Sequence, residues 1–205
     1  MLQTITGTAA ELGSRVETAL ASYRYKIFLE KLGWPLPSKN GEEVDEFDRT
    51  DTVYVIAKDQ CGEICGCARL LPTTRPYLLR EIFPELMGDI PLPNSADTWE
   101  LSRFSATPLN EPSSNTAQAW KNTCTLVAET VSAAIQLGAS RLIAFSAVGN
   151  ERLLRRMGVS VHRVSAPQLI DSKPVLAFWI EIDEQTKTAL NITSRSSAPL
   201  FKTNS

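Results

Sequence analysis

A strand–helix–strand pattern in the middle of the chain constrains the fold more than any other feature. The segment TWELSRFSA at 98–106 alternates as a strand does, residues 115–137 are Ala-rich and helical in pattern, and RLIAFSAV at 141–148 is almost continuously apolar. Two strands joined through a helix pair in parallel with a right-handed crossover. We therefore expect a parallel pair inside a sheet, and a splayed pair of this kind is a natural place for a ligand.

The flanking segments add antiparallel strands and further helices. An amphipathic helix is expected over 10–32, followed by an irregular loop over 35–51. The turn at 59–62 joins two hairpin strands, and the remaining apolar runs predict these elements: strands at 52–58, 63–71, 159–164 and 175–182, and helices at 78–87 and 150–157. The pattern predicts an α/β fold, a three-layer α/β/α sandwich with a mixed central sheet. We expect a single domain over 1–205 with a frayed tail from about residue 191.

Charge and composition exclude several classes of protein. The 205 residues carry 21 basic and 23 acidic side chains, which argues against a strongly basic nucleic-acid binder. The start of the chain lacks a signal-peptide pattern and no run approaches a membrane helix, so we expect a cytoplasmic protein without a membrane partner. The cysteine spacing C-x3-C-x-C, with one histidine in the chain, does not match a zinc site, and no metal is expected.

Three charged residues stand inside apolar strands. Arg69 lies in CARLLPTT, and Glu100 and Arg103 lie in WELSRF. Buried charges are costly unless they are paired, so a buried ion-pair network is one reading. Such a network can also orient a substrate, because an arginine can clamp a carboxylate and a glutamate can act as a general base. Strand alternation predicts that Arg103 shares a side with Trp99, opposite Glu100.

Two more clusters could hold a cationic ligand. Arg24 and Phe28 are neighbours on one helix face, and Trp34 follows the helix. They are either core aromatics beside a solvated arginine or an aromatic wall that attracts positive charge. The run EEVDEFDRTD at 42–51 is either a solvated acidic loop or a source of carboxylates from Asp45 and Asp48. Because the apolar Val44 and Phe47 interleave the acids, part of this loop is expected to pack inward.

These clusters resemble the acyl-homoserine lactone synthases, the LuxI-type autoinducer synthases. The resemblance rests on E-x-D-x-F-D-x-x-D-T-x-Y-V, G-x-x-R-L-L-P-T-T-R-P-Y-L-L and W-E-L-S-R-F, and extends from about residue 20 to 190. It is carried by eight signature positions: Arg24, Phe28, Trp34, Asp45, Asp48, Arg69, Glu100 and Arg103. It implies a fold related to the GCN5-type N-acetyltransferases.

The resemblance also implies a reaction. Acyl carrier protein would deliver an acyl chain to S-adenosylmethionine, and the products would be an N-acyl-L-homoserine lactone and 5′-methylthioadenosine. S-adenosylmethionine is then a substrate, and no cofactor is expected. Phe28 and Trp34 would wall the adenosyl and sulfonium part, and Asp45 and Asp48 would hold positive charge and order the loop. Any of the three signature arginines could clamp the carboxylate, and Glu100 is the candidate proton acceptor.

The second substrate needs an apolar tunnel and a dock for the carrier. Candidate tunnel residues, each equally readable as plain core, are Leu101, Phe104, Val127, Phe145, Ala147, Met157 and Trp179. Because Ala147 stands where makers of 3-oxo-acyl products often carry threonine, we expect an unsubstituted chain near octanoyl. The acidic carrier would meet Arg152, Arg155 and Arg156, with Arg163 nearby and Lys121 more distant, although these arginines could equally form a solvated helix face.

Two rival functions stay open at this point. The first is an acetyl-CoA-dependent N-acetyltransferase, but the segment TPLNEPSSNTA after the central strand has no glycine for a pyrophosphate-binding loop. The second is a non-catalytic acyl-carrier-binding module, which would have little use for so many charges of the buried type. The oligomeric state does not follow from the sequence, although a monomer is compatible with it.

Overall fold

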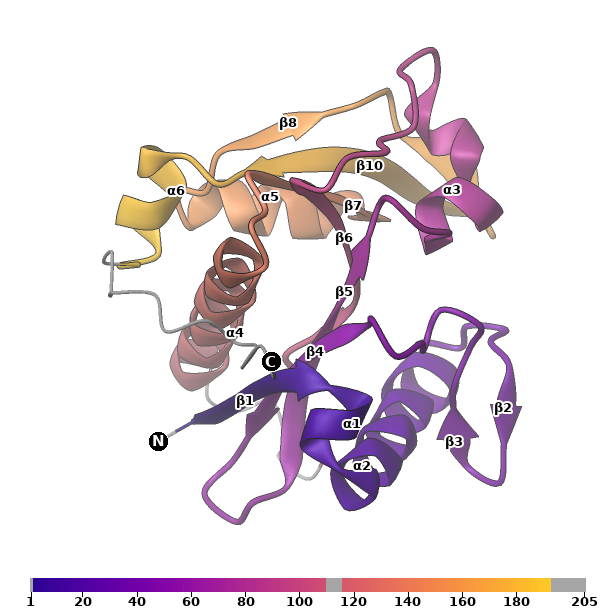
Figure 1. Cartoon of the computed structure of the whole chain (residues 1–205), viewed down its shortest axis with the longest axis vertical. Helices are drawn as coiled ribbons and strands as arrows, with labels where there is room; N and C mark the ends of the chain where they lie inside the picture. The colour runs from indigo at the N-terminus through magenta and orange to yellow at the C-terminus, as the bar shows by residue number, and fades with distance from the viewer. Residues whose placement is uncertain (1, 110–115, 193–205) are drawn as a thin grey trace, which may run out of the picture. The chain divides into compact units, whose positions relative to one another are not determined.

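The computed structural model describes residues 2–109 and 116–192 (Figure 1). The chain divides into two compact units, each built from two stretches of sequence. The first unit draws on residues 1–69 and 103–130, and the second on residues 70–102 and 131–205. The chain therefore changes unit within two of its strands and once within a long helix. No helix among the described residues is long and apolar enough to cross a membrane.

The first unit packs two short helices and a π-helix against a small sheet. Its strand order is β1-β4-β5, with β1 and β4 antiparallel in the register Gln3↔Lys58 to Thr8↔Val53. Apolar side chains of these elements, Leu20, Ile27 and Ile56 among them, form one buried cluster. The elements are β1 (Gln3–Thr8), α1 (Ala9–Leu12), α2 (Ser14–Arg24), η1 (Tyr25–Lys31), β4 (Val53–Lys58) and most of β5 (Ile64–Pro72). Strand β1 was not expected from the sequence.

The helix expected over 10–32 is interrupted twice. Gly13, with a φ of 80°, separates α1 from α2, and the last seven residues form the π-helix η1. Its wider turn shows in the hydrogen bonds from Leu32 N to Ile27 O (3.0 Å) and from Trp34 N to Phe28 O (2.9 Å). π-Turns of this kind are rare in proteins as a whole, and those that occur are often found at functional sites. The amphipathic pattern predicted the helix but not its two breaks.

A small hairpin stands where an irregular loop was expected. Strands β2 (Ser38–Lys39) and β3 (Glu42–Glu43) are antiparallel, and Asn40-Gly41 forms the two-residue turn between them. Both turn residues have positive φ, 53° and 78°, as hairpin turns of this length require. The hairpin fixes the start of the acidic run on the rest of the first unit.

The second unit contains the predicted parallel pair. Strands β6 (Thr98–Ser105) and β7 (Arg141–Ala147) are parallel from Thr98↔Arg141 to Leu101↔Ala144, and α4 (Thr116–Gln136) joins them, which confirms the crossover. Strand order continues as β6-β7-β10-β8, with β10 antiparallel to β7. The remaining elements are α3 (Leu78–Ile82), η2 (Pro84–Met87), α5 (Val148–Arg156), β8 (Val161–Arg163), β9 (Gln168–Ile170), β10 (Lys173–Glu181) and α6 (Glu184–Ala189). The α/β class with a mixed sheet is confirmed.

The alternation of β6 changes phase at Arg103. Thr98, Glu100 and Ser102 are buried, but the next buried positions are Arg103 and Ser105. Arg103 has a φ of 49°, a left-handed conformation that is uncommon for a residue with a side chain and that bends a strand locally. The prediction that Arg103 follows the alternation of Trp99 is therefore wrong, because the backbone turns at Arg103 itself.

Candidate active site

Three arginines converge in the first unit from three different elements. Arg24 ends α2, Arg69 lies on β5 and Arg103 lies on β6, and their exposed fractions are 3%, 0% and 6%. Removing a guanidinium from water is expensive unless carboxylates replace its hydration. Matching anions must therefore lie nearby.

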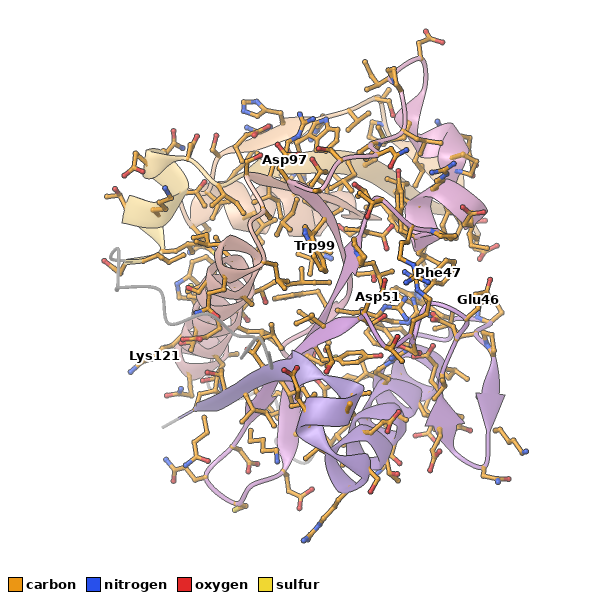
Figure 2. The ribbon with its side chains drawn as sticks, in the orientation of Figure 1. Glu46, Phe47, Asp51, Asp97, Trp99 and Lys121 are labelled. Atoms are coloured by element: carbon orange, nitrogen blue, oxygen red, sulfur yellow. The ribbon has the colours of Figure 1, made fainter. Side chains whose placement is uncertain are left out.

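The acidic segment after β3 supplies those anions. The chain turns over Asp45–Asp48, where Asp48 N donates to Asp45 O at 3.1 Å and Phe47 N donates to Asp45 Oδ1 at 2.9 Å. The side chains of Glu43, Asp45, Phe47 and Asp48 all point inward. Phe47 is 2% exposed, as expected, and its neighbour Glu46 is exposed (Figure 2). Val44 is 51% exposed, so the apolar side chain that packs the loop inward is that of Phe47 and not that of Val44. The inward ring of Phe47 anchors the loop and sets the carboxylates against the arginines.

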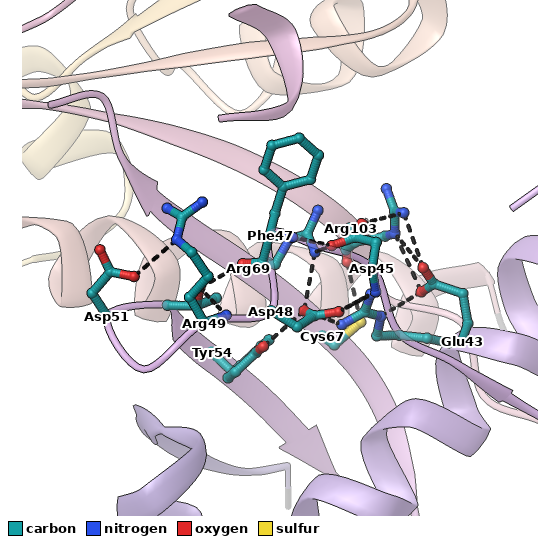
Figure 3. Close-up of polar contacts among 12 residues, drawn as sticks. Glu43, Asp45, Phe47, Asp48, Arg49, Asp51, Tyr54, Cys67, Arg69 and Arg103 are labelled. Carbon is teal, nitrogen blue, oxygen red and sulfur yellow. Dashed lines mark hydrogen bonds and ion pairs between the residues drawn. The ribbon is translucent and has the colours of Figure 1, made fainter. Parts of the chain in front are cut away.

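Arg24 is fully engaged by two of these carboxylates. Its Nε donates to Glu43 Oε2 at 2.5 Å, while Nη1 and Nη2 donate to the two oxygens of Asp48 at 2.7 and 3.0 Å (Figure 3). A bidentate pair of this kind fixes both position and orientation. Arg24 thus holds the loop to the helix.

The other two arginines complete a ring of charges. Arg69 Nη1 donates to Asp45 Oδ1 at 2.6 Å and to Asp48 Oδ1 at 3.0 Å. Arg103 Nη2 donates to Glu43 Oε1 at 3.0 Å and to Asp45 Oδ2 at 2.8 Å. Each carboxylate bridges two arginines. The positive charges that Asp45 and Asp48 hold here are guanidinium groups of the protein.

The network keeps its acids ionised. Burial by itself raises the pKa of Glu43, but hydrogen bonds from Arg24 and Arg103, with their charges, lower it more, so the pKa lies below its ordinary value. The pKa of Asp48 is likewise lowered, because the charges of Arg24 and Arg69 outweigh burial. Burial raises the pKa of the Cys67 thiol to about 12, so this thiol stays protonated against the Arg103 carbonyl.

Arg103 also faces an aromatic stack. Its guanidinium carbon lies 5.7 Å from the centre of the Phe28 ring, and Phe28 stacks on Trp34 with centroids 5.1 Å apart and planes 21° apart. Phe28 is buried, whereas Trp34 is 39% exposed. Among the described residues, Arg103 makes its polar side-chain contacts through Nε and Nη2; Nη1 points away from the carboxylates in Figure 3. The site therefore presents the guanidinium of Arg103 beside the accessible indole ring of Trp34.

Glu100 lies in the second unit, three residues before Arg103 on the same strand. It is fully buried, and its Oε2 accepts a 2.6 Å hydrogen bond from the backbone N–H of Leu79 at the start of α3. Its pairing opposite Ile143 puts it on the same face of β6 and β7 as Phe145. Glu100 therefore has a structural task, holding α3, besides any chemical one.

The proposed tunnel residues are spread over both units. Phe104 and Val127 belong to the first unit, where Val127 is buried. In the second unit, Phe145 contacts Phe83, with ring centroids 5.1 Å apart. Leu101 is paired with Ala144 and so projects from the face opposite to Phe145.

The other tunnel candidates in the second unit have varied surroundings. The guanidinium of Arg141 covers the ring of Trp179 at 4.3 Å. Met157 is half-buried after α5, and Ala147 is exposed at the end of β7. A pocket confined to one face of the sheet would therefore not include the whole predicted set.

The predicted carrier dock forms an exposed basic face on α5. Arg152, Arg155 and Arg156 are exposed. Buried Glu151 accepts hydrogen bonds from Arg155, one helical turn on, and from Arg163 Nη2 at 2.8 Å. Glu151 thereby orients two of the basic side chains and neutralises part of their charge. Lys121 lies on α4, in the first unit.

Sequence reasoning missed two members of the charge network. Glu43 is fully buried and bridges Arg24 and Arg103, and Tyr54 donates its hydroxyl to Asp48 Oδ1 at 2.7 Å. One signal could have found Glu43. The dipeptide Asn40-Gly41 marks a hairpin, and Glu43 lies on the strand that returns from its turn.

Comparisons with known proteins agree with this fold. The model of the autoinducer synthase family matches residues 12–190. An acyl-homoserine-lactone synthase of Ralstonia solanacearum is 46% identical over 200 residues, which cover 97% of this chain and 98% of the relative. The solved structure of TofI with an inhibitor and MTA is 46% identical, with a TM-score of 0.82 over 93% of this chain and 97% of that one.

Two further structures define the wider class. A CoA-dependent acyl-homoserine lactone synthase, BjaI, solved with SAM and isopentyl-CoA, has a TM-score of 0.80 at 26% identity and covers 93% of this chain and 87% of its own. An acyl-CoA N-acyltransferase from Pseudomonas aeruginosa shares the fold alone, with a TM-score of 0.58 at 16% identity over 87% and 99% of the two chains. Fold and likeness together define an acyltransferase of the GCN5-related α/β class.

The same comparisons identify the family within that class. The chain belongs to the autoinducer synthase family, and its activity is that of an acyl-homoserine-lactone synthase. Seven of the eight signature positions identified in the sequence lie in the first unit, around the charge ring and the aromatic stack, and the eighth, Glu100, lies in the second.

Proposed function

We propose that this protein transfers an acyl chain from acyl carrier protein to the amino group of S-adenosylmethionine and then closes the product to an N-acyl-L-homoserine lactone. One observation carries the proposal: a charge-balanced ring of three arginines and three carboxylates holds Arg103 next to a stack that ends in an accessible tryptophan. The chemistry of this site matches a substrate with both a carboxylate and a sulfonium. Related structures contain SAM or MTA, which supports the same substrate.

Each part of the site has a distinct role toward S-adenosylmethionine. Arg103 donates through Nη1 to the substrate carboxylate, while its other nitrogens stay on Glu43 and Asp45. The exposed face of Trp34 attracts the sulfonium, and Phe28 supports the indole from behind. Arg24, Arg69, Asp45 and Asp48 act as positioning residues, since their charges are already matched within the ring.

The chemistry proceeds in two bond exchanges. The neutral amine attacks the thioester carbonyl; the C–N bond forms, the carbon–sulfur bond breaks with its electron pair, and the carrier leaves as a thiolate. The proton that the amine nitrogen loses passes through a water to Glu100, the candidate general base, and then to the thiolate, so the carrier is released as a thiol. A carboxylate oxygen of the acylated substrate then attacks its own γ-carbon, and the bond to the sulfonium breaks with its electron pair, releasing 5′-methylthioadenosine. This second step is intramolecular, so folding the substrate supplies much of the acceleration.

The donor and the chain length are the finer parts of the proposal. The exposed arginines of α5, of which Arg155 is held by Glu151, suit the acidic surface of a carrier protein. The expected product is an unsubstituted chain near octanoyl, because Ala147 offers no hydroxyl to a 3-oxo group. BjaI is CoA-dependent, so acyl-CoA is the donor to test against acyl carrier protein.

One assay tests all parts of this function. Purified protein is incubated with S-adenosylmethionine and octanoyl donors on carrier protein or CoA, and 5′-methylthioadenosine and lactone are measured by mass spectrometry. We expect turnover with the carrier-bound donor and lactones of medium, unsubstituted chains. Absence of methylthioadenosine with every donor would overturn the function, and mainly 3-oxo products would overturn the chain assignment.

A further inference from the structure

A shallow pocket lies on the first unit beside the π-helix. Its volume is about 310 Å³, and it is lined by Lys26, Glu30 and Lys31 of η1 and by Pro108 and Leu109, which follow β6. It is not among the sites identified from the signature residues, and none of its lining residues belongs to the charge ring. It therefore requires its own explanation.

The π-helix places the two lysines on the same side of the helix. Its hydrogen bonds join residues five apart, as from Leu32 N to Ile27 O, so Lys26 and Lys31 lie one above the other on neighbouring turns. In an α-helix a separation of five residues would point them apart. Both lysines are exposed, and neither has an ion-pair partner within residues 2–109 and 116–192.

The opposite wall is apolar and fixed in place. Tyr23 on α2 donates its hydroxyl to the carbonyl of Thr107 at 2.8 Å and lies 3.2 Å from Ser105 Oγ. These bonds tie the segment that carries Pro108 and Leu109 to the helix that continues into η1. The pocket thus combines paired cations with an apolar side, a combination that suits an anionic group on a branched aliphatic stem.

We propose that this pocket is a phosphate subsite for the acyl donor, in which Lys26 and Lys31 hold the phosphodiester of a phosphopantetheine arm. The proposal rests on the function proposed above. Acyl carrier protein and CoA share this phosphate and the dimethyl-substituted carbons next to it, which would face Pro108 and Leu109. Pro108 lies five residues beyond Arg103 and so at most about 18 Å away, and the arm, with its two amide units, spans a distance of that order.

Glu30 makes the proposal sharper because it lines the same pocket as the two lysines. Its carboxylate reduces the positive charge of the pocket and repels a phosphate. Replacing the lysines and replacing Glu30 should therefore change phosphate binding in opposite directions. A role of these residues in folding alone would not predict that reversal.

The test compares donors that differ only in the phosphate. Calorimetric titration measures binding of octanoyl-4′-phosphopantetheine and octanoyl-pantetheine to the full chain and to three variants: K26Q/K31Q, E30Q and, as a control on the exposed β2 strand, K39Q. Two exposed ion contacts predict that K26Q/K31Q weakens binding of the phosphorylated compound about tenfold. The same variant should leave octanoyl-pantetheine unchanged, E30Q should strengthen the phosphorylated compound, and K39Q should alter neither.

The outcomes separate this proposal from the proposed function. Equal effects of K26Q/K31Q on both compounds, or no preference of the unmodified chain for the phosphate, would overturn the phosphate subsite whether or not the enzyme turns over. Turnover with acyl carrier protein and with acyl-CoA then distinguishes the sources of the arm. A loss with carrier protein alone would mean that the lysines meet the carrier's surface and would also overturn the proposal.

Discussion

At the scale of single residues, the site depends on matched charges more than on any one group. Glu43 illustrates this, because it is fully buried and binds two arginines that come from different elements. The three arginines and three carboxylates are buried from water, so removing any one of them leaves a partner with an unpaired charge. The residues therefore act as a set.

Replacing Glu43 by glutamine should destabilise the protein strongly. The variant leaves three buried arginines with two carboxylates, and losing one partner of a buried pair costs about 3–5 kcal/mol. Urea unfolding followed by circular dichroism measures the free energy of unfolding. The exposed neighbour supplies the matched control, E46Q, which should change it little. Equal stability of E43Q and E46Q would contradict the matched-charge account.

One substitution can separate the two roles of Glu100, which are to hold α3 and to accept a proton. In E100Q the amide oxygen can still accept the Leu79 N–H, but it cannot take a proton at neutral pH. If Glu100 is the general base, kcat should fall by about 10²–10⁴ while the melting temperature stays close to that of the unmodified chain. The pH dependence of kcat should lose its acidic limb. A variant that keeps kcat and that limb would leave Glu100 only the task of holding α3.

At the scale of elements, two short segments set the geometry. The π-helix η1 places Phe28 against Arg103, and the bend at Arg103 turns that side chain toward Glu43 and Asp45. In the second unit, α5 presents its arginines on one exposed face with Glu151 beneath them. Local backbone departures and one buried acid thus direct the charged groups.

Reversing the charge of α5 should weaken the carrier protein as a substrate. We expect R152E/R156E to raise the KM for octanoyl-carrier protein about tenfold or more at low salt, since rim charges chiefly set association between complementary surfaces. The difference should shrink as ionic strength rises. The KM for S-adenosylmethionine serves as the internal control and should stay the same. An unchanged KM for the carrier at low salt would rule out this docking face.

At the scale of the whole molecule, acidic and basic side chains are unevenly distributed along the chain. Residues 1–110 contain 11 basic and 16 acidic side chains, and residues 111–205 contain 10 and 7. The acidic excess of the first stretch does not come from the ring, where three arginines match three carboxylates. The consequence of the charge ring is that the free energy of unfolding of the chain depends on pH.

The native state should resist mild acid and unfold only under stronger acid. The pKa values of Glu43 and Asp48 are lowered in the folded chain, so their contribution is complete above the ordinary carboxyl pKa of about 4. It is lost as the pH falls below that value toward the folded pKa values. Thermal unfolding between pH 7 and pH 2 measures this, and the melting temperature should stay nearly constant to about pH 5 and fall below about pH 4. A steep fall between pH 7 and 5 would contradict it.

The sequence alone determined most of the local elements, although not β1 or the hairpin of β2 and β3, and it determined the signature residues. Helical and strand periodicity, the crossover at 98–148 and the apolar setting of Arg69 and Arg103 are properties of short stretches, so the printed residues were enough to predict them. Only the tertiary structure decided the partners. That Glu43 bridges Arg24 and Arg103, and that β6 changes phase at Arg103, depends on groups up to 60 residues apart meeting in a medium that excludes water. Pairing of buried charges is a long-range requirement, and no local pattern carries it.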